Sequence, residues 1–228
     1  MSVTGALFRI YRPIAIPFAG LVVLAELIIV GLVSSTKDMG FSMWLTLAGS
    51  AAKYWLLVVG IMLVVMQLRQ FVVNGVTRHE FLAGAGVFGL ILAVGFALAV
   101  VLGHGLESVV LEALGKRAAG YPSAAPGALV REFGHILPET LAYLVSGAMI
   151  AAGFYRWRAW LGLVVMVGGA IPAAIADGLL GVDEFGGMGD RVPYAAALVL
   201  SVVATAAVAV AFHRAISDVA IKRTGTAG

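Results

Sequence analysis

The stretch LAGAGVFGLILAVGFALAVVL, residues 82–102, contains no charged side chain. A membrane hydrocarbon core roughly 30 Å thick needs about 20 apolar residues of helix to cross it. This stretch has that length and therefore predicts a membrane span. Lipid cannot satisfy open backbone groups, and no alternating pattern of the kind found in barrel strands is present, so we expect the span to be helical.

The same length criterion identifies five further spans, at residues 14–33, 49–68, 136–155, 161–180 and 193–212. Within residues 161–180, Pro172 and Asp177 predict a broken helix in the outer half of the span. The sequence therefore predicts an all-α integral membrane protein with six transmembrane helices. No internal repeat is visible, so residues 1–228 are expected to form a single transmembrane domain.

Composition leads to the same class of protein. The chain has 228 residues, of which 61% are hydrophobic and 12% charged, and its mean hydropathy is +1.03. Soluble proteins are nearer half apolar and a quarter charged, so this balance indicates a membrane protein. The sequence has no cysteine, which excludes disulfides, iron–sulfur clusters and thiol catalysis. We expect membrane lipid around the chain and no nucleic-acid partner.

Basic residues gather in the connections on one side of the predicted membrane. That side carries nine basic residues against two acidic ones, and the opposite side carries five against nine. By the positive-inside rule, the basic side and both termini are cytoplasmic, as an even number of spans also requires. The nine basic residues are Arg9, Arg12, Arg69, Arg78, Arg156, Arg158, Arg214, Lys222 and Arg223.

The segment before the first span is predicted to lie on the membrane surface. In ALFRIYRP, residues 6–13, Leu7, Ile10 and Tyr11 share one side of a possible helix. Residues 1–13 therefore predict a short amphipathic helix on the inner leaflet, ended by Pro13.

Two long connections are expected outside the membrane, at residues 103–135 and 181–192. In the first, LESVVLEALGKR (residues 106–117) is predicted to form a short amphipathic helix before the turn-rich GYPSAAPG (residues 120–127). The second, GVDEFGGMGDR, is acidic and rich in glycine.

Three of the ionisable residues within the predicted spans, Glu26, Lys53 and Asp177, are candidates for an ion pair or a path. An ionisable group in hydrocarbon costs several kcal/mol and normally faces a partner or a water-filled path. Glu26 and Lys53 lie on spans joined by a short external connection, so we expect the two to be neighbours that can pair. They are either a structural ion pair or part of a transport path. Asp177 either lines an outer vestibule or is solvated at a helix end.

His104 and His135 bracket the first external connection, and each is followed by a glutamate at helical spacing. His104 precedes Glu107 by three residues and His135 precedes Glu139 by four, so each pair can share a helix face, as metal ligands do. Pro138 disfavours a regular helix in the second pair, and the sequence predicts no metal site.

Two catalytic motifs are excluded. His79 and Glu80 resemble the start of a zinc-protease H-E-x-x-H motif, but Ala83 stands where its second histidine is required. No lysine precedes Ser or Thr, as a phosphate-binding P-loop requires. The chain therefore lacks its own ATP site.

A polar island, FVVNGVTRHEFLAG (residues 71–84), separates two of the apolar spans. Asn74-Gly75 is a turn signal, and Thr77 with Glu80 three residues later matches a capping box. We therefore predict that the chain turns here and starts a new helix near Arg78. A capped cytoplasmic hairpin explains the whole stretch without assigning it a function.

Within this island, NGVTRHEF resembles the G-V-T/S-R-x-x-F element between the second and third spans of permease subunits in the ABC-2 exporter group. The resemblance implies that residues 74–81 are a cytoplasmic coupling element that binds a separate ATP-binding subunit. It implies that Phe81 is an apolar anchor, that Arg78 is an electrostatic contact, and that Thr77 with Glu80 keeps the element helical. The implied partner-binding residues are Gly75, Val76, Thr77, Arg78, His79, Glu80 and Phe81.

The resemblance also implies a function and a setting. The chain is expected to be the permease subunit of an ATP-driven exporter of small or amphipathic molecules such as a drug, peptide or lipid, in a bacterial-type cytoplasmic membrane. It is no enzyme by itself and holds no cofactor, because the partner subunit supplies ATP and magnesium. A second permease copy or homologue completes the assembly.

Two alternatives stay open: a secondary carrier or channel using Glu26, Lys53 and Asp177, and a membrane enzyme or accessory subunit.

Overall fold

The computed structural model describes residues 2–36, 38–183, 185–188 and 192–217, and these residues form helices and no β-strand. Six helical stretches are long and apolar enough to cross a membrane, which confirms the predicted number of spans. The helices are α1 (Val3–Thr36), α2 (Met43–Met62), η1 (Leu63–Gln67), α3 (Leu68–Val73), α4 (Arg78–Ala113), α5 (Pro126–Arg156), α6 (Ala159–Leu180) and α7 (Tyr194–Ser217).

The second membrane stretch is one continuous helix with an irregular turn inside it. α2, η1 and α3 follow one another without a break over Met43–Val73, and η1 is a π-helical turn. Such turns occur mostly as single bulges within α-helices, frequently at functional sites. The sequence pattern predicts the helix but not the bulge.

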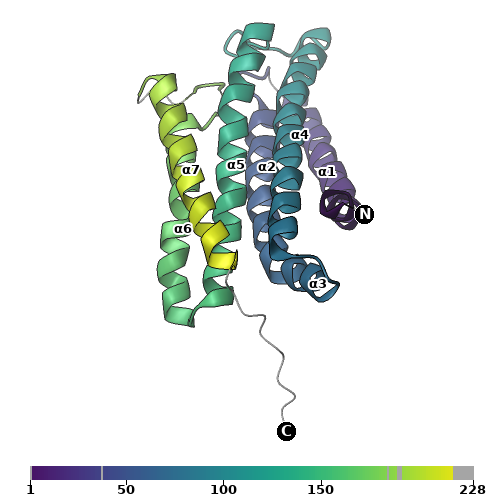
Figure 1. Ribbon diagram of the computed structural model, residues 1–228. Helices are drawn as coiled ribbons and strands as arrows, with labels where there is room; N and C mark the ends of the chain where they lie inside the picture. Colours follow the sequence, from purple (N-terminus) through teal and green to yellow (C-terminus); the bar gives the residue numbers. More distant parts are fainter. Residues whose placement is uncertain (1, 37, 184, 189–191, 218–228) are drawn as a thin grey trace.

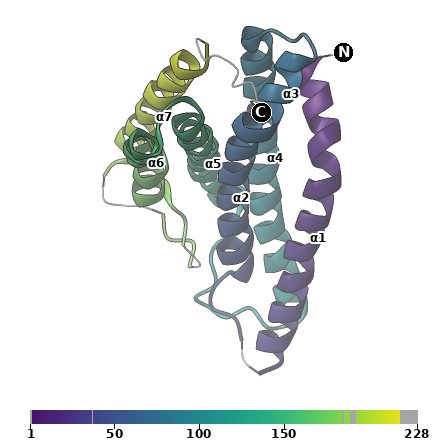
Figure 2. The same cartoon turned by 90° about the horizontal axis from the view of Figure 1, so that it is seen from below.

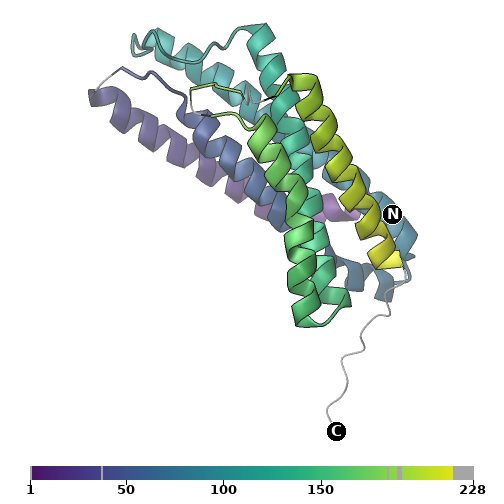
Figure 3. The same ribbon diagram turned by 90° about the vertical axis from the view of Figure 1, so that its left-hand side faces the viewer.

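The helices form a bundle around α5. Seen from below in Figure 2, α1 lies at one edge, α6 and α7 lie at the other, and α2, α4 and α5 lie between them. α5 is the most buried of the six stretches, whereas α1 and α7 leave most of their surface exposed. In Figure 3, α1, α2 and α4 lean away from the direction of α6 and α7, so the bundle widens toward the end that carries the α4–α5 connection.

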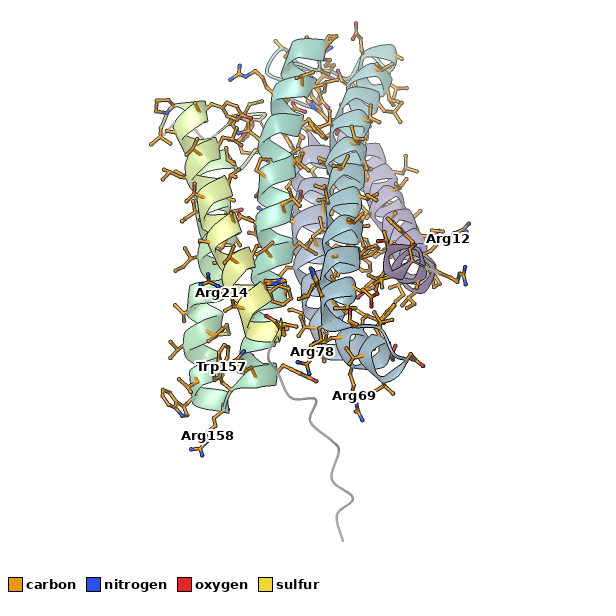
Figure 4. All side chains as sticks on the ribbon, viewed as in Figure 1. Arg12, Arg69, Arg78, Trp157, Arg158 and Arg214 are labelled. Atoms are coloured by element: carbon orange, nitrogen blue, oxygen red, sulfur yellow. The ribbon has the colours of Figure 1, made fainter. Side chains whose placement is uncertain are left out.

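Several of the basic side chains lie at one end of the bundle. The turns at residues 74–77 and 157–158 lie at the same end as the last residues of α7, and the α4–α5 connection lies at the opposite end (Figure 1). Figure 4 shows Arg69, Arg78 and Arg158 at the lower end. The predicted orientation also depends on several charged residues that lie outside the described residues: Lys37, Glu184, Asp190, Arg191, Asp218, Lys222 and Arg223.

The predicted end of a separate first helix at Pro13 is wrong. α1 runs without interruption from Val3 to Thr36, with Pro13 inside it. Leu7 and Tyr11 are buried against Phe88 of α4. A broken helix would leave backbone groups without partners in lipid, which favours continuation through a proline.

The predicted outer connection at residues 103–135 is much shorter than expected. α4 continues to Ala113, so residues 106–113 extend a membrane helix instead of forming a separate one. Gly115, at φ +65°, provides the left-handed residue that ends it. α5 starts with Pro126 at its first turn and runs through Pro138, so only residues 114–125 connect the two helices.

The predicted break in the fifth span is also absent. α6 is continuous from Ala159 to Leu180 and contains both Pro172 and Asp177. The N–H of Ala173, next to the proline, donates to the Ser146 hydroxyl of α5 at 3.3 Å. A neighbouring helix thus satisfies a backbone group near the irregular point, as membrane helices require.

Small residues set the closest helix contacts. A Cβ atom at Gly147 of α5 would lie 2.0 Å from the Leu57 carbonyl oxygen of α2, and one at Gly60 would lie 2.2 Å from the Leu144 carbonyl oxygen. These two glycines let the backbones of α2 and α5 meet. Small residues also line a packing face of α4, where Ala93 and Ala97 are fully buried.

Candidate functional site

The turn between α3 and α4 has the predicted local structure. Gly75 adopts φ +88°, which a glycine tolerates best, directly after the helix end at Asn74. The Thr77 hydroxyl accepts from the Glu80 N–H at 3.2 Å, and the Glu80 carboxylate accepts from the Thr77 N–H at 2.9 Å. Both halves of the capping box are present, and α4 begins at Arg78 as expected.

Phe81 is not available to a partner. Its side chain is 1% exposed and packs among Val64, Leu68, Ala148 and Ile216. The expected role of this ring as an anchor in another subunit is therefore wrong. The helical period places Phe81 on the inner face of α4, one turn after the cap, where α3, α5 and α7 cover it.

The exposed surface of the element lies just before Phe81. Val73, at the end of α3, is 70% exposed although it is apolar. It is followed by the exposed residues Asn74, Gly75, Thr77, His79 and Glu80, whereas Val76 and Arg78 are half-buried. We call residues 73–80 the α3–α4 turn surface. It presents one apolar side chain with polar neighbours at the basic end of the bundle.

Arg78 ties this turn to the end of α7. Its guanidinium donates to the Ser217 carbonyl oxygen at 2.9 Å, and the rings of His79 and His213 lie 6.2 Å apart. Arg156, at the end of α5, donates to the Ala215 carbonyl oxygen. Cations at the C-terminus of a helix interact favourably with its unsatisfied carbonyl groups. These arginines therefore hold α7 against the α3–α4 turn and α5.

Lys53 pairs with different residues from the one expected. Its Nζ lies 3.1 Å from a Glu139 carboxylate oxygen of α5 and also contacts the Asp177 carboxylate of α6. The Tyr143 hydroxyl donates to Asp177 at 3.3 Å. Lys53 therefore does not form the possible pair with Glu26, because two acids from α5 and α6 approach the lysine instead.

This charged cluster borders a cavity of about 100 Å³. Polar side chains line much of it, including Thr46, Ser50 and Asp183 beside Lys53 and Glu139. One lysine faces two partnered acids, so the cluster has one excess negative charge when all three groups are ionised. Such a site can hold a structural ion triad together, or it can bind a small cation or proton.

Glu26 lies in a separate place, on the α1 side of the bundle. It is 6% exposed and borders a groove that Glu107 of α4 also borders. Glu107 accepts from the hydroxyls of Ser42, at 2.5 Å, and Tyr121, at 2.9 Å, and from the Met43 N–H at 3.1 Å. The carboxylate thus stands at the N-terminus of α2, where helix N–H groups bind anions.

Tyr121, in the α4–α5 connection, was not predicted to belong to a site. Burial is the main cause that raises the pKa of its hydroxyl above the ordinary value, and the nearby Glu107 charge raises it further. The tyrosine therefore keeps its proton and serves as a donor to Glu107. Arg117 lies 5.4 Å from the centre of the Tyr121 ring.

The histidines do not pair with the glutamates at helical spacing. His104 Nδ1 lies 2.9 Å from Glu132 of α5, and His135 Nδ1 lies 3.0 Å from the Leu180 carbonyl oxygen of α6. Because side chains three or four residues apart share a face but point outward from one helix, neighbouring helices supply the actual partners. Within the described residues, no group of three or more His, Cys, Asp or Glu side chains is placed to hold a metal ion.

Comparison of the sequence with family models, with curated proteins and with solved structures finds no match.

Proposed function

We propose that this chain is the permease subunit of an ABC-2-type, ATP-driven exporter. The observation that carries the proposal is the exposed, capped α3–α4 turn surface between the second and third membrane stretches. Its sequence, NGVTRHEF, resembles the coupling element of that group. The six-span architecture with an exposed turn at the basic end also supports the proposal.

The proposed docking residues differ from those that the motif alone suggests. Val73 replaces Phe81 as the apolar contact, because its side chain is 70% exposed at the tip of the turn. His79 and Glu80 supply exposed polar groups on the first turn of α4. We propose that these side chains enter a groove of a separate ATP-binding subunit, which binds ATP and magnesium.

A movement of the α3–α4 turn would be transmitted directly to the helices that it contacts. Phe81 packs against α3, α5 and α7, and Arg78 bonds to the last turn of α7. The π-helical turn η1 lies immediately before α3, within the same membrane stretch. We propose that closure of the ATP-binding subunits moves the α3–α4 turn and that η1 absorbs part of the change.

The proposed assembly contains two permease copies and two ATP-binding subunits in a bacterial-type cytoplasmic membrane, with both permease termini cytoplasmic. The clustering of arginines at the end that carries the α3–α4 turn supports this orientation. The exposed apolar faces of α1 and α7 offer surface for lipid or for the second copy. The proposed substrate is a small or amphipathic molecule.

Co-purification from native membranes tests the proposal. Val73→Asp is expected to abolish recovery of an ATP-binding protein, because a charge replaces the apolar contact. Val130→Asp is the matched control, since Val130 is 71% exposed and lies at the other end of the bundle. Loss of the partner from both variants, or from neither, contradicts the proposed docking surface. Phe81→Asp is unsuitable because it would place a charge in the core.

A secondary carrier is the second candidate, and the Lys53, Glu139 and Asp177 cluster favours it. The cluster lies on three membrane helices beside a polar cavity, as a cation or proton path requires. A carrier predicts that the purified chain alone dissipates a proton gradient across liposomes and that Glu139→Gln stops the leak. The permease proposal predicts an intact gradient with the chain alone.

A further inference from the structure

A cavity of about 320 Å³ lies at the end of the bundle opposite the α3–α4 turn. It is bordered by residues 122–123 of the α4–α5 connection, by the first turns of α5, and by residues 185–188 of the α6–α7 connection. Binding pockets for small molecules begin at about 300 Å³, so this cavity has the size for a small ligand.

The wall from the α6–α7 connection is a tight turn. The Asp183 carboxylate accepts hydrogen bonds from the N–H groups of Phe185, at 2.9 Å, and Gly187, at 2.7 Å. Gly186 adopts φ +70°, and a Cβ atom there would lie 2.7 Å from the Pro122 Cβ. The two connections therefore pack closely, and the turn places the Phe185 ring, which is 61% exposed, at the cavity.

Glu132 of α5 brings a carboxyl group to the cavity wall. Its Oε2 lies 2.9 Å from Nδ1 of the fully buried His104, whose Nε2 has no hydrogen-bond partner in the described part of the chain. A protonated imidazole needs acceptors for two N–H groups, so this geometry favours a neutral ring that donates to an ionised Glu132. The second oxygen, Oε1, accepts no hydrogen bond within the described residues, and it is not enclosed as both oxygens of Glu26 are.

Arg131 brings the opposite charge to the same cavity. Its side chain is exposed, and within the described ranges it forms no ion pair, not even with the adjacent Glu132. Arg117, in contrast, pairs with Glu112 at 3.0 Å. The cavity therefore presents one cationic and one anionic group that do not neutralise each other, together with the apolar ring of Phe185.

We propose that this cavity binds a small zwitterion with an apolar side chain, of the size of an aromatic amino acid. Its carboxylate binds the Arg131 guanidinium, which offers paired N–H donors, and its ammonium group donates to Glu132 Oε1. Its side chain packs against Phe185. A ligand with only one charge leaves either Arg131 or Glu132 without a partner, so the zwitterion is preferred over an amine or an acid.

This inference goes beyond the proposed function, because binding at this end of the bundle requires no ATP-binding subunit. Failure of zwitterion binding would leave the α3–α4 turn surface unaffected as a docking site, and failure of docking would leave the cavity unaffected.

The test uses the full chain in dodecyl maltoside, an uncharged detergent, and follows ligand binding by fluorine NMR. The probe is 4-fluoro-L-phenylalanine. We expect saturable line broadening of this probe, and at least ten-fold weaker binding of 4-fluorophenethylamine, which lacks the carboxylate, and of 3-(4-fluorophenyl)propionate, which lacks the ammonium group. Glycerophosphoethanolamine, a lipid headgroup with both charges but no apolar side chain, should not displace the probe.

Two substitutions locate the site. Arg131→Gln and Glu132→Gln should each weaken binding of the probe at least ten-fold, because each removes one charge from the cavity. Arg158→Gln is the matched control, since Arg158 is an exposed arginine at the opposite end of the bundle (Figure 4). It should bind the probe as the unchanged chain does.

Four results would overturn the inference: no saturable broadening with the unchanged chain, equal binding of either singly charged ligand, displacement of the probe by the headgroup, or unchanged binding in Arg131→Gln. If Glu132→Gln fails to fold, Arg131→Gln and the comparison of ligands on the unchanged chain still decide the matter.

Discussion

At the scale of single residues, Lys53 joins three helices through two carboxylates. Glu139 and Asp177 stand 86 and 124 positions away along the chain, and the Glu139 side chain is almost fully buried. A single sequence gives no indication that residues so far apart along the chain are in contact. The capping box of Thr77 and Glu80, in contrast, is local and was predicted. Local hydrogen bonds follow from spacing, whereas partners on other helices follow only from packing.

The Lys53 cluster predicts a coupled loss of stability. Lys53→Met leaves Glu139 buried beside a like charge, so we expect the free energy of unfolding to fall by about 2 kcal/mol. Adding Glu139→Gln should restore much of that loss, because the uncompensated charge disappears. Chemical or thermal unfolding in detergent measures the cycle. Additive effects of the two substitutions would contradict the proposed coupling.

Lys116→Met is the control for this cycle. Lys116 lies 3.9 Å from Asp38, both side chains are largely solvated, and an exposed pair of this kind contributes about 0–1 kcal/mol. Its removal should leave the unfolding midpoint nearly unchanged.

At the scale of elements, the helices run through prolines that were predicted to end, break or disfavour a regular helix. α1 contains Pro13, α5 contains Pro138 and α6 contains Pro172. Rules derived from soluble proteins overstate the free-energy cost of continuing a helix through a proline. In lipid, a helix that ended there would leave backbone N–H and C=O groups without hydrogen-bond partners. The boundary at Gly75 was predicted, since an Asn-Gly turn and a cap act together there. The end of α4 at Gly115 was missed.

The contact between α2 and α5 predicts a sharp difference between two glycines. Gly147→Ala should destabilise the bundle by more than about 1 kcal/mol, because its Cβ would lie 2.0 Å from a backbone oxygen of α2. Gly86→Ala on α4 meets nothing within 4 Å and should be neutral or slightly stabilising. Thermal unfolding of the two variants in one detergent compares them. Equal midpoints would contradict the close packing of α2 on α5.

At the scale of the whole molecule, six hydrophobic stretches were enough to predict the number of spans. Length and apolar character are properties of each stretch alone, and the structure confirms the number. The arrangement of the helices around α5 was not predictable, because it depends on which small residues meet, such as Gly60 and Gly147. The candidate sites show the same difference. The local structure of the α3–α4 turn was predicted from the sequence, whereas the ion-pair partners of Lys53 were not.

The proposed orientation predicts where single cysteines react. The natural chain has none, so Asn74→Cys and Ser123→Cys each introduce one exposed thiol, at opposite ends of the bundle. In intact cells, a membrane-impermeant maleimide should label position 123 and should label position 74 only after the cells are opened. The reverse pattern would contradict cytoplasmic placement of the α3–α4 turn.

The central claim is that the α3–α4 turn surface binds a separate ATP-binding subunit, and photocrosslinking in intact cells tests it most directly. A benzophenone amino acid at position 73 should crosslink an ATP-binding protein that mass spectrometry identifies, because Val73 stands exposed at the tip of the turn. The same amino acid at position 130 should not. Crosslinking of lipid alone at position 73, or of the same protein from both positions, would contradict the claim.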